Sequence, residues 1–343
     1  MTAVVQRAYG GPEVLAVEEV ATPTPAAGEV LIDVRATDVS AGDVHLLTGR
    51  PYVVRAMGFG LRRPSASVPG RSFAGVVAAL GPGVTSYEVG DAVLCNDERG
   101  GGGLAEYQVA RTDELLRVPA PVDFAEAATL PWAVTALQAL RDRAETSMGG
   151  RVLVHGASGG VGHFAVQIAR GLGMDVTATH RGAHDAWLKS LGARRTVDTS
   201  REDPLAEADA YDAILDMVCD RPLAHFRRAL SPRGTYLSVG GELGDGALAD
   251  WLGFPLRMVR IAAANAFRSR RMSLMASSAV PADVRAVVAL AEAGTLRATV
   301  GATFPLERAA DAYRSFMRGG TRGKTVVVQP GLDPRHSAEP ARP

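Results

Sequence analysis

Up to about residue 123 the chain consists of short apolar or alternating runs separated by turn residues, which predicts a mostly β region with long connections. Strands are expected there at 14–20, 29–36, 75–80, 91–95 and 105–110. Beyond it, apolar runs alternate with stretches of helical periodicity, which predicts a parallel, doubly wound sheet. Its strands are expected at 152–155, 175–179, 213–218 and 235–239, and its helices at 164–172, 183–191 and 222–230. The predicted fold class is therefore α/β, with a partly open β-barrel beside the parallel sheet.

A glycine-rich turn directly follows the apolar run that ends at His155. Residues 156–162 read GASGGVG, and a helical pattern starts at once. Gly160 lets backbone amides approach a pyrophosphate and Gly162 permits close contact between helix and sheet. The helix N-terminus adds a partial positive charge. A bare strand-to-helix turn is the plainer interpretation, but the strand before and the helix after it favour a dinucleotide site. Its predicted members are Ala157, Ser158, Gly159, Gly160, Val161 and Gly162.

The composition narrows the classes of function. A chain of 343 residues is long enough for two domains of roughly 150 residues each. Its 37 basic and 37 acidic side chains balance, so no overall charge attracts nucleic acid or an anionic membrane. Cys95 and Cys219 are the only cysteines, too few for a disulfide framework. With neither a secretion signal nor an apolar run of membrane-spanning length, we expect a cytoplasmic protein.

Several separated segments resemble the medium-chain dehydrogenase/reductase superfamily, and within it the zinc-free quinone oxidoreductases, a branch that includes bacterial proteins labelled NAD(P)-dependent alcohol dehydrogenases. Besides the glycine turn they lie at 9–15, 25–34, 36–49, 69–77, 90–93, 105–107, 211–216 and 323–328. The resemblance implies a GroES-like catalytic domain built from 1–125 and 279–330, with a Rossmann domain at 126–278 inserted between its parts. The tail, 331–343, is rich in proline and charge and is expected to be disordered. The family habit is a homodimer, with the edge strand near 272–277 as the expected contact.

The metal ligands of zinc-containing relatives are missing. Where those relatives carry a cysteine ahead of an aspartate, this chain has Ser40 before Asp43, and in place of Gly-His-Glu it has Gly70, Arg71 and Ser72. A catalytic zinc needs three Cys, His or carboxylate ligands and a structural zinc four, so we expect no zinc. Without a Lewis acid, alcohol oxidation and simple carbonyl reduction are disfavoured. A quinone or an enone delocalises the incoming charge itself, and hydride transfer then needs mainly positioning and a proton source.

The expected activity is therefore NADPH-dependent reduction of a small quinone or α,β-unsaturated carbonyl. Three catalytic candidates follow: Ser40 and His45 as hydrogen-bond partners near the nicotinamide, and Tyr52 as proton donor to the developing enolate. His45 as an ordinary helix-end histidine, Tyr52 as a packing aromatic and bulk water as the proton source stay open. A zinc-free alcohol or aldehyde dehydrogenase and a cofactor-binding protein without catalysis are the competing interpretations.

The choice of nicotinamide depends on the end of the second strand of the parallel sheet. NAD-preferring sites place Asp or Glu there, but this strand ends in Thr179, His180 and Arg181, and the first acid is Asp185. Thr179, His180, Arg181 and His184 are expected to contact the cofactor, and Arg181 and His184 to meet a 2′-phosphate, which favours NADPH over NADH.

Further cofactor contacts are expected from other parts of the chain. Ser238, Val239 and Gly240 end a strand at the edge where open α/β sheets gather ligands. By resemblance, Thr135 approaches the nicotinamide and Lys324 faces the cofactor phosphates. A buried threonine bonded to its own helix and a surface lysine capping a strand are the plainer interpretations.

Overall fold

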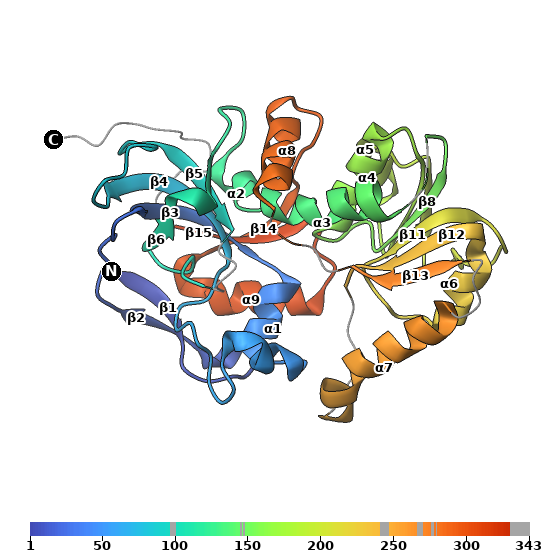
Figure 1. Ribbon diagram of the computed structural model, residues 1–343, viewed down its shortest axis with the longest axis horizontal. Coiled ribbons are helices and arrows are strands. Elements are labelled where there is room, and N and C mark those ends of the chain that lie inside the picture. Colours follow the sequence, from blue (N-terminus) through green and yellow to red (C-terminus); the bar gives the residue numbers. More distant parts are fainter. Residues whose placement is uncertain are drawn as a thin grey trace. The chain divides into compact units, whose positions relative to one another are not determined.

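The computed structural model describes residues 1–96, 101–144, 146, 148–240, 247–265, 270–275, 278 and 280–329, with the backbone alone for 247–255. The chain divides into two compact units (Figure 1). The first unit combines residues 1–131 with the C-terminal part from 279 onward, and the second comprises 132–278. The predicted tail at 331–343 lies outside the described residues.

The first unit is built on strands that pair antiparallel, except for β14 and β15, which run parallel. Its larger sheet has the order β14-β15-β3-β4-β5-β7, with β6 paired to β3, and a separate pair is formed by β1 and β2. The strands are β1 (Thr2–Gln6), β2 (Leu15–Glu19), β3 (Glu29–Val39), β4 (Ser72–Leu80), β5 (Ala92–Asn96), β6 (Tyr107–Arg111), β7 (Leu115–Arg117), β14 (Val300–Pro305) and β15 (Lys324–Val328). The helices are α1 (Ala41–Thr48), α2 (Phe124–Ala127), α8 (Pro281–Glu292) and α9 (Ala309–Arg318).

The alternation of side chains along β3 gives this sheet one buried, apolar face. Val30, Ile32 and Val34 point to one face and are buried, while the residues between them are partly exposed. They pack in one cluster with Phe73 and Val93 of the neighbouring strands β4 and β5. The C-terminal strand β15 pairs antiparallel with β3, so the two ends of the chain share this sheet.

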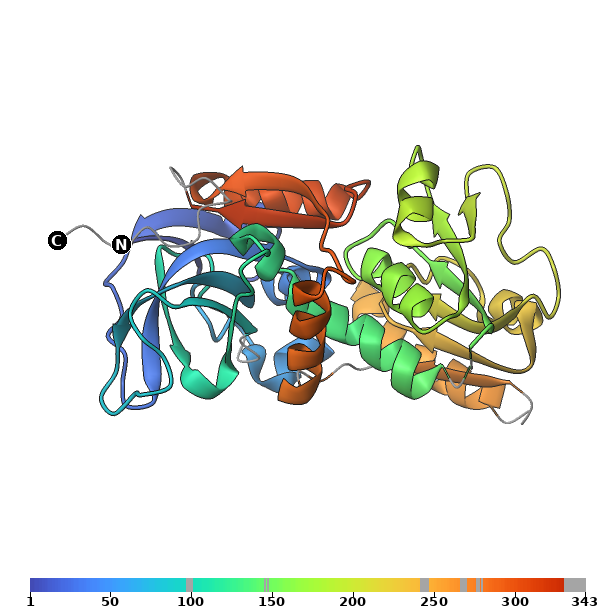
Figure 2. The same ribbon diagram turned by 90° about the horizontal axis from the view of Figure 1, so that it is seen from above.

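The second unit is a parallel sheet with helices on both faces. Its strands are β8 (Arg151–His155), β9 (Asp175–His180), β10 (Arg195–Asp198), β11 (Tyr211–Asp216), β12 (Leu230–Ser238) and β13 (Arg271–Leu274). Its helices are α3 (Ala133–Gln138), α4 (Gly162–Gly171), α5 (Asp185–Leu191), α6 (Leu223–Ala229) and α7 (Ala247–Asn265). α4 and α5 cover one face and α6 and α7 the other (Figures 1 and 2).

The strand order β10-β9-β8-β11-β12-β13 places the earliest strand of this unit, β8, in the middle. All neighbouring pairs run parallel. The chain order reverses between β8 and β11, and ligands of such sheets bind at the carboxyl ends of the strands beside this switch point. The predicted α/β fold class is confirmed, and the switch point shows where to look for a site.

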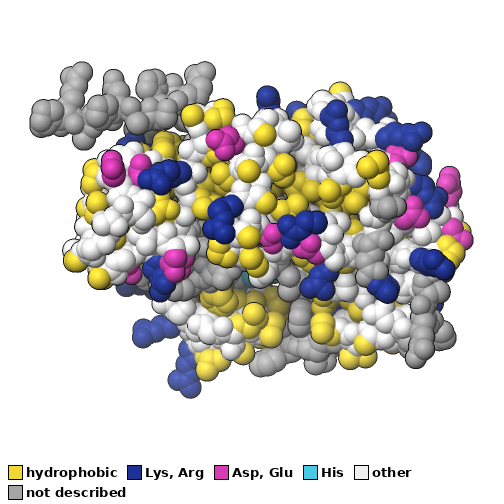
Figure 3. Space-filling view, turned by 45° about the horizontal axis from the view of Figure 1, so that its top comes forward, with side chains coloured by type: hydrophobic (Ala, Val, Ile, Leu, Met, Phe, Trp, Pro, Cys, Tyr) yellow, Lys and Arg dark blue, Asp and Glu magenta, His cyan; other side chains and the backbone are white. Residues whose placement is uncertain are grey.

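The surface agrees with the balanced charge of the sequence. On the face shown in Figure 3, basic and acidic side chains are interspersed rather than gathered. In the part of the chain that the structure describes, no helix combines the length and the apolar character needed to cross a bilayer.

Candidate functional site

The glycine turn between β8 and α4 has no room for side chains at two positions. Gly156 has φ +85°, and a Cβ on it would lie 2.7 Å from the Val218 side chain. A Cβ on Gly162 would lie 2.3 Å from the carbonyl oxygen of Gly156 and 2.7 Å from the Cα of Ala157. Glycine here lets α4 begin directly against the strand.

The segment before α4 is open to a ligand. Ser158, Gly159, Gly160 and Val161 are partly exposed, whereas Gly162 is buried. Amide groups and a partial positive charge at the N-terminus of a helix attract phosphate groups. The local structure therefore fits the pyrophosphate of a dinucleotide, and the contacts of the individual residues with it stay a prediction.

Thr179 connects this turn to β9. Its Oγ1 accepts a hydrogen bond from the Gly156 amide at 2.9 Å and lies 2.9 Å from His155 Nδ1, and its carbonyl oxygen accepts from the Ala157 amide at 2.9 Å. The side chain is buried. Thr179, predicted as a cofactor contact, is thus engaged in shaping the turn.

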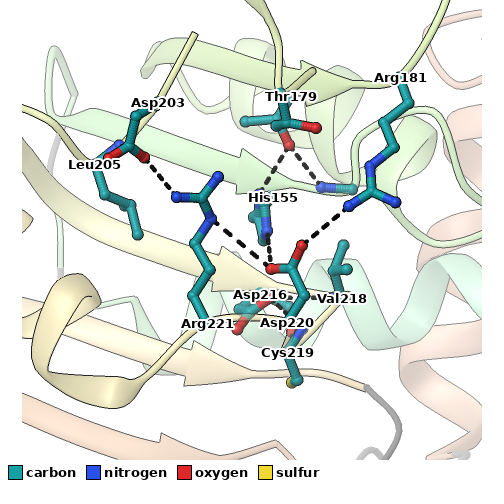
Figure 4. A network of polar contacts seen from close by, with 12 residues as sticks. His155, Thr179, Arg181, Asp203, Leu205, Asp216, Val218, Cys219, Asp220 and Arg221 are labelled. Carbon is teal, nitrogen blue, oxygen red and sulfur yellow. Dashed lines mark hydrogen bonds and ion pairs between the residues drawn. The ribbon is translucent and has the colours of Figure 1, made fainter. Parts of the chain in front are cut away.

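His155 extends the same network to the loop after β11 (Figure 4). Its ring is 2 % exposed, and Nε2 lies 3.0 Å from Asp220 Oδ1. Because Nε2 faces a carboxylate oxygen, we assign a proton to Nε2, which donates to Asp220. A continuous set of hydrogen bonds then runs from Gly156 through Thr179 and His155 to Asp220.

The loop that carries Asp220 is fixed by a buried carboxylate at the end of β11. Asp216 is 0 % exposed; its Oδ1 accepts hydrogen bonds from the amides of Val218 at 3.0 Å and Cys219 at 2.8 Å, and its Oδ2 accepts from the Tyr236 hydroxyl at 2.7 Å. Cys219 adopts φ +60°, a left-handed conformation that favours glycine. This turn holds Asp220 against His155.

Two arginines share the Asp220 carboxylate with His155. The terminal nitrogen of Arg181 lies 3.4 Å from Asp220 Oδ2, and Nε of Arg221 lies 4.0 Å from Oδ1. Burial alone would raise the pKa of Asp220, but the hydrogen bond from His155 and the arginine charges lower it overall. Arg221 also donates to Asp203 Oδ1 at 2.7 Å, as Figure 4 shows.

The other residues predicted to select the nicotinamide, at the end of β9 and just after it, differ in exposure. Arg181 is exposed, with 74 % of its side chain accessible. His180 is buried, and its Nε2 lies 3.2 Å from Asp185 Oδ1, which also accepts from the Thr196 hydroxyl at 2.7 Å. The His184 ring is partly buried, edge-on to His180 at 5.9 Å between centroids. His180 thus supports the start of α5, and Arg181 presents the exposed charge.

Ser238, Val239 and Gly240 end β12 beside the same switch-point loop. The Ser238 hydroxyl lies 3.2 Å from Cys219 Sγ and accepts from Arg257 at 2.9 Å, and the Val239 amide donates to the Asp216 carbonyl oxygen at 2.8 Å. Burial, followed by the charge of Asp216, raises the pKa of Cys219 to about 11. The thiol is therefore protonated near neutral pH.

The sequence did not predict several members of this network. They are His155, Asp216, Asp220, Tyr236 and Arg257. His155 ends a predicted strand and Asp216 lies near the end of another, and polar residues at that edge of a parallel sheet are a signal that points to a site. Nothing local distinguishes Tyr236 within its strand or Arg257 within its helix.

In the first unit, Ser40 stands where the resemblance puts a cysteine of zinc-containing relatives, and Ser72 where it puts the glutamate of Gly-His-Glu. The Ser40 hydroxyl donates to Asp43 Oδ2 and accepts from the Asp43 amide at 3.3 Å, which caps α1. Ser72 Oγ donates to the Ala128 carbonyl oxygen at 2.6 Å, and both serines are buried. No group of three or more His, Cys, Asp or Glu side chains able to hold a metal occurs among the described residues.

The two other catalytic candidates follow Ser40 along the chain. His45 lies in the last turn of α1, with Nδ1 2.8 Å from the Arg50 carbonyl oxygen. The guanidinium carbon of Arg55 lies 4.7 Å from the centroid of the Tyr52 ring and 4.4 Å from the centroid of the Tyr9 ring. Both candidates are partly exposed, so each side chain is reachable.

The two remaining cofactor candidates are buried. Thr135 on α3 is 8 % exposed, and its contact with the nicotinamide stays a prediction. Lys324 begins β15, and its Nζ lies 2.8 Å from Asp38 Oδ2, with side-chain exposures of 3 % and 0 %. The ammonium group of Lys324 is thus enclosed in an ion pair within the first unit, and its contact with the cofactor phosphates stays a prediction.

Comparison with known proteins agrees with this architecture. Residues 26–120 match the family described as "Alcohol dehydrogenase GroES-like domain", and residues 191–327 the family described as "Zinc-binding dehydrogenase". The chain is 31% identical to the "Chloroplast envelope quinone oxidoreductase homolog" of Arabidopsis thaliana, over 96% of this chain and 98% of that protein.

Solved structures give the same result. The quinone oxidoreductase from Coxiella burnetii superimposes with a TM-score of 0.80 at 28% identity, covering 96% of this chain and 99% of that one. A structure titled as an NAD-dependent alcohol dehydrogenase has the same score, identity and coverage. The fold is that of nicotinamide-dinucleotide-dependent enzymes with a GroES-like and a Rossmann domain. The chain belongs to the quinone oxidoreductase-like branch of the medium-chain dehydrogenase/reductase superfamily and is an oxidoreductase.

Proposed function

We propose that this oxidoreductase uses NADPH to reduce a small quinone or α,β-unsaturated carbonyl, and that it needs no zinc. The proposal depends most on Ser40 and Ser72, whose hydroxyls are engaged in buried hydrogen bonds to Asp43 and to the Ala128 carbonyl oxygen. A protonated serine hydroxyl is a poor replacement for the thiolate, imidazole or carboxylate that binds zinc. Substrates that stabilise incoming negative charge by resonance fit such an enzyme.

The cofactor site is proposed to lie along the carboxyl edge of the second unit. The glycine turn would hold the pyrophosphate through backbone amides, and Ser238 to Gly240 would border the nicotinamide half. Arg181 is the exposed cation that would meet a 2′-phosphate. Asp185, the nearest acid along the chain, already accepts hydrogen bonds from Thr196 and His180, which supports NADPH over NADH. When bound, the reduced nicotinamide supplies a hydride.

Residues of the first unit are proposed to supply the proton that the reaction needs. The Tyr52 hydroxyl is proposed to donate a proton to the oxygen of the reduced substrate, and His45 to hydrogen-bond nearby. Tyr52 is partly exposed and its ring lies under the guanidinium of Arg55. Ser40 is proposed to orient its surroundings through Asp43 rather than to exchange a proton.

The names of two relatives support a quinone as acceptor, since the similar proteins of Arabidopsis thaliana and Coxiella burnetii are named for quinone oxidoreduction. The neighbour titled as an NAD-dependent alcohol dehydrogenase favours a second candidate, a zinc-free alcohol dehydrogenase. We further propose a homodimer through β13, an edge strand of the second sheet; of the expected contact, residues 276 and 277 lie outside the described part. Sedimentation at several concentrations tests the dimer.

The activity is tested by following NADPH oxidation at 340 nm with a benzoquinone and a simple enone, before and after dialysis against a chelator. We expect turnover that the chelator leaves unchanged, and a lower kcat/KM with NADH. Loss of activity that added zinc restores would refute the metal-free chemistry. Alcohol-dependent reduction of NADP⁺ without quinone reduction would favour the dehydrogenase, and tight nucleotide binding without turnover would remove the catalytic proposal.

A further inference from the structure

The arginine proposed to select NADPH already has a carboxylate beside it. Arg181 lies 3.4 Å from Asp220 Oδ2 in an ion pair whose side chains are 74 % and 30 % exposed. We propose that Asp220 is a specificity-determining residue that competes with the 2′-phosphate for Arg181 and weakens the preference for NADPH over NADH. This inference rests on the proposed cofactor site, in which the end of β9 meets the adenosine ribose.

Asp220 is held in its position from two directions. His155 donates to its Oδ1 at 3.0 Å, and His155 is itself fixed by Thr179. The loop that presents Asp220 is anchored by two amide hydrogen bonds to the buried Asp216 carboxylate. Arg181, in contrast, is largely exposed. The carboxylate is therefore the fixed member of the pair and the guanidinium the one that moves.

The formal charges of Asp220 and the charged side chains paired around it sum to zero. Arg221 pairs with Asp203 at 2.7 Å and approaches Asp220 at 4.0 Å, so two arginines stand against two aspartates. The lowered pKa of Asp220 keeps its carboxylate ionised at neutral pH. A 2′-phosphate carries about −1.5 to −2 charges and would meet a cluster of zero net charge. Removing the Asp220 charge leaves an excess of one positive charge.

Asn is the informative replacement at position 220. Its amide oxygen still accepts the hydrogen bond from His155, so the substitution removes the charge and keeps the shape. By Coulomb's law in water, one charge roughly 6 Å from a phosphate dianion changes its affinity about five- to tenfold. A nucleotide without the 2′-phosphate lacks this interaction and is expected to bind unchanged.

A second ion pair, at the other end of β9 from Arg181, offers a matched control. Arg194 pairs with Asp175 at 2.7 Å, with side-chain exposures of 79 % and 30 %, nearly those of Arg181 and Asp220. Asp175 begins β9, at the opposite edge of the sheet. Asp175→Asn therefore makes the same charge change on a similar ion pair, away from the proposed site.

The test compares the binding of 2′,5′-ADP and 5′-ADP to the full chain by calorimetry at low salt. In Asp220→Asn we expect 2′,5′-ADP to bind about five- to tenfold more tightly, with 5′-ADP unchanged, and a smaller gain as salt screens the charge. Arg181→Gln should weaken 2′,5′-ADP alone, and Asp175→Asn should change neither affinity. Asp220→Ser serves as a second variant should the first fail to fold.

An unchanged or weaker affinity for 2′,5′-ADP in Asp220→Asn overturns the inference, as does an equal gain for both nucleotides. These results leave the proposed cofactor site intact as long as the wild-type chain binds both nucleotides. A wild-type chain that binds neither nucleotide refutes the proposed site itself, together with the inference that rests on it.

Discussion

Replacing Gly162 by alanine tests whether close contact between α4 and β8 builds the cofactor site. The new Cβ would lie 2.3 Å from the Gly156 carbonyl oxygen and 2.7 Å from the Ala157 Cα, and both are backbone atoms that cannot rotate away. Ordinary contacts of this kind are at least about 3.4 Å, so the start of α4 must shift by about 1 Å. Overpacking of this size destabilises a fold by about 1–3 kcal/mol, reduced by the better helix propensity of alanine.

Gly171 at the other end of α4 is the matched control, because nothing lies within 4 Å of a Cβ built there and the residue is exposed. Gly171→Ala should stabilise the chain by up to about 1 kcal/mol. Urea unfolding of both variants measures the free energies, and calorimetry with 5′-ADP measures binding. We expect the Gly162→Ala variant to be less stable and to bind 5′-ADP at least about tenfold more weakly, because the amides at the start of α4 are displaced. Equal stability and equal binding in the two variants would refute the argument.

Three further predictions concern single side chains. Lys324→Met removes the ammonium group that pairs with the Asp38 carboxylate, which is 0 % exposed, and should lower the unfolding free energy by about 3–5 kcal/mol; unchanged stability with weaker NADPH binding would indicate that Lys324 acts on the cofactor instead. Tyr52→Phe should lower kcat by a factor of about 10² to 10⁴ and leave the Kd of NADPH unchanged, whereas an unaltered kcat would assign the proton to bulk water. Because partial burial raises the pKa of Cys219 to about 11, the thiolate is scarce at pH 7.5 and its share grows only as the pH approaches that value; mass spectrometry should find Cys219 unmodified by iodoacetamide at pH 7.5, and fast labelling there would contradict the protonated thiol.

The glycine turn was predictable because everything that defines it is adjacent in the chain. The apolar run ending at His155, the glycines and the periodicity of α4 occupy consecutive residues, and the structure places each as expected. Arg181 was also predictable, since it ends the next strand. These are features that local pattern and backbone geometry determine.

The partners of these residues were not predictable in the same way. Asp220 reaches His155 and Arg181 only because β11 lies beside β8 in the strand order, and no periodicity reveals that order. Lys324 illustrates the same limit, since the pairing of β15 with β3 encloses its ammonium group beside Asp38. A resemblance assigns a role to a position, but burial and register decide whether the side chain is available for it.

The network also implies that the pyrophosphate turn and the charge beside the ribose are not independent. Thr179 accepts from the Gly156 amide and contacts the ring of His155, which donates to Asp220. Thr179→Val keeps the shape of the side chain and removes both hydrogen bonds, so the Gly156 amide and the buried His155 ring nitrogen each lose a partner. Residues in one hydrogen-bond network act non-additively, so the gain in 2′,5′-ADP affinity on Asp220→Asn should differ between the wild-type and the Thr179→Val backgrounds. Additive effects would mean that the exposed pair of Arg181 and Asp220 acts alone, without support from the turn.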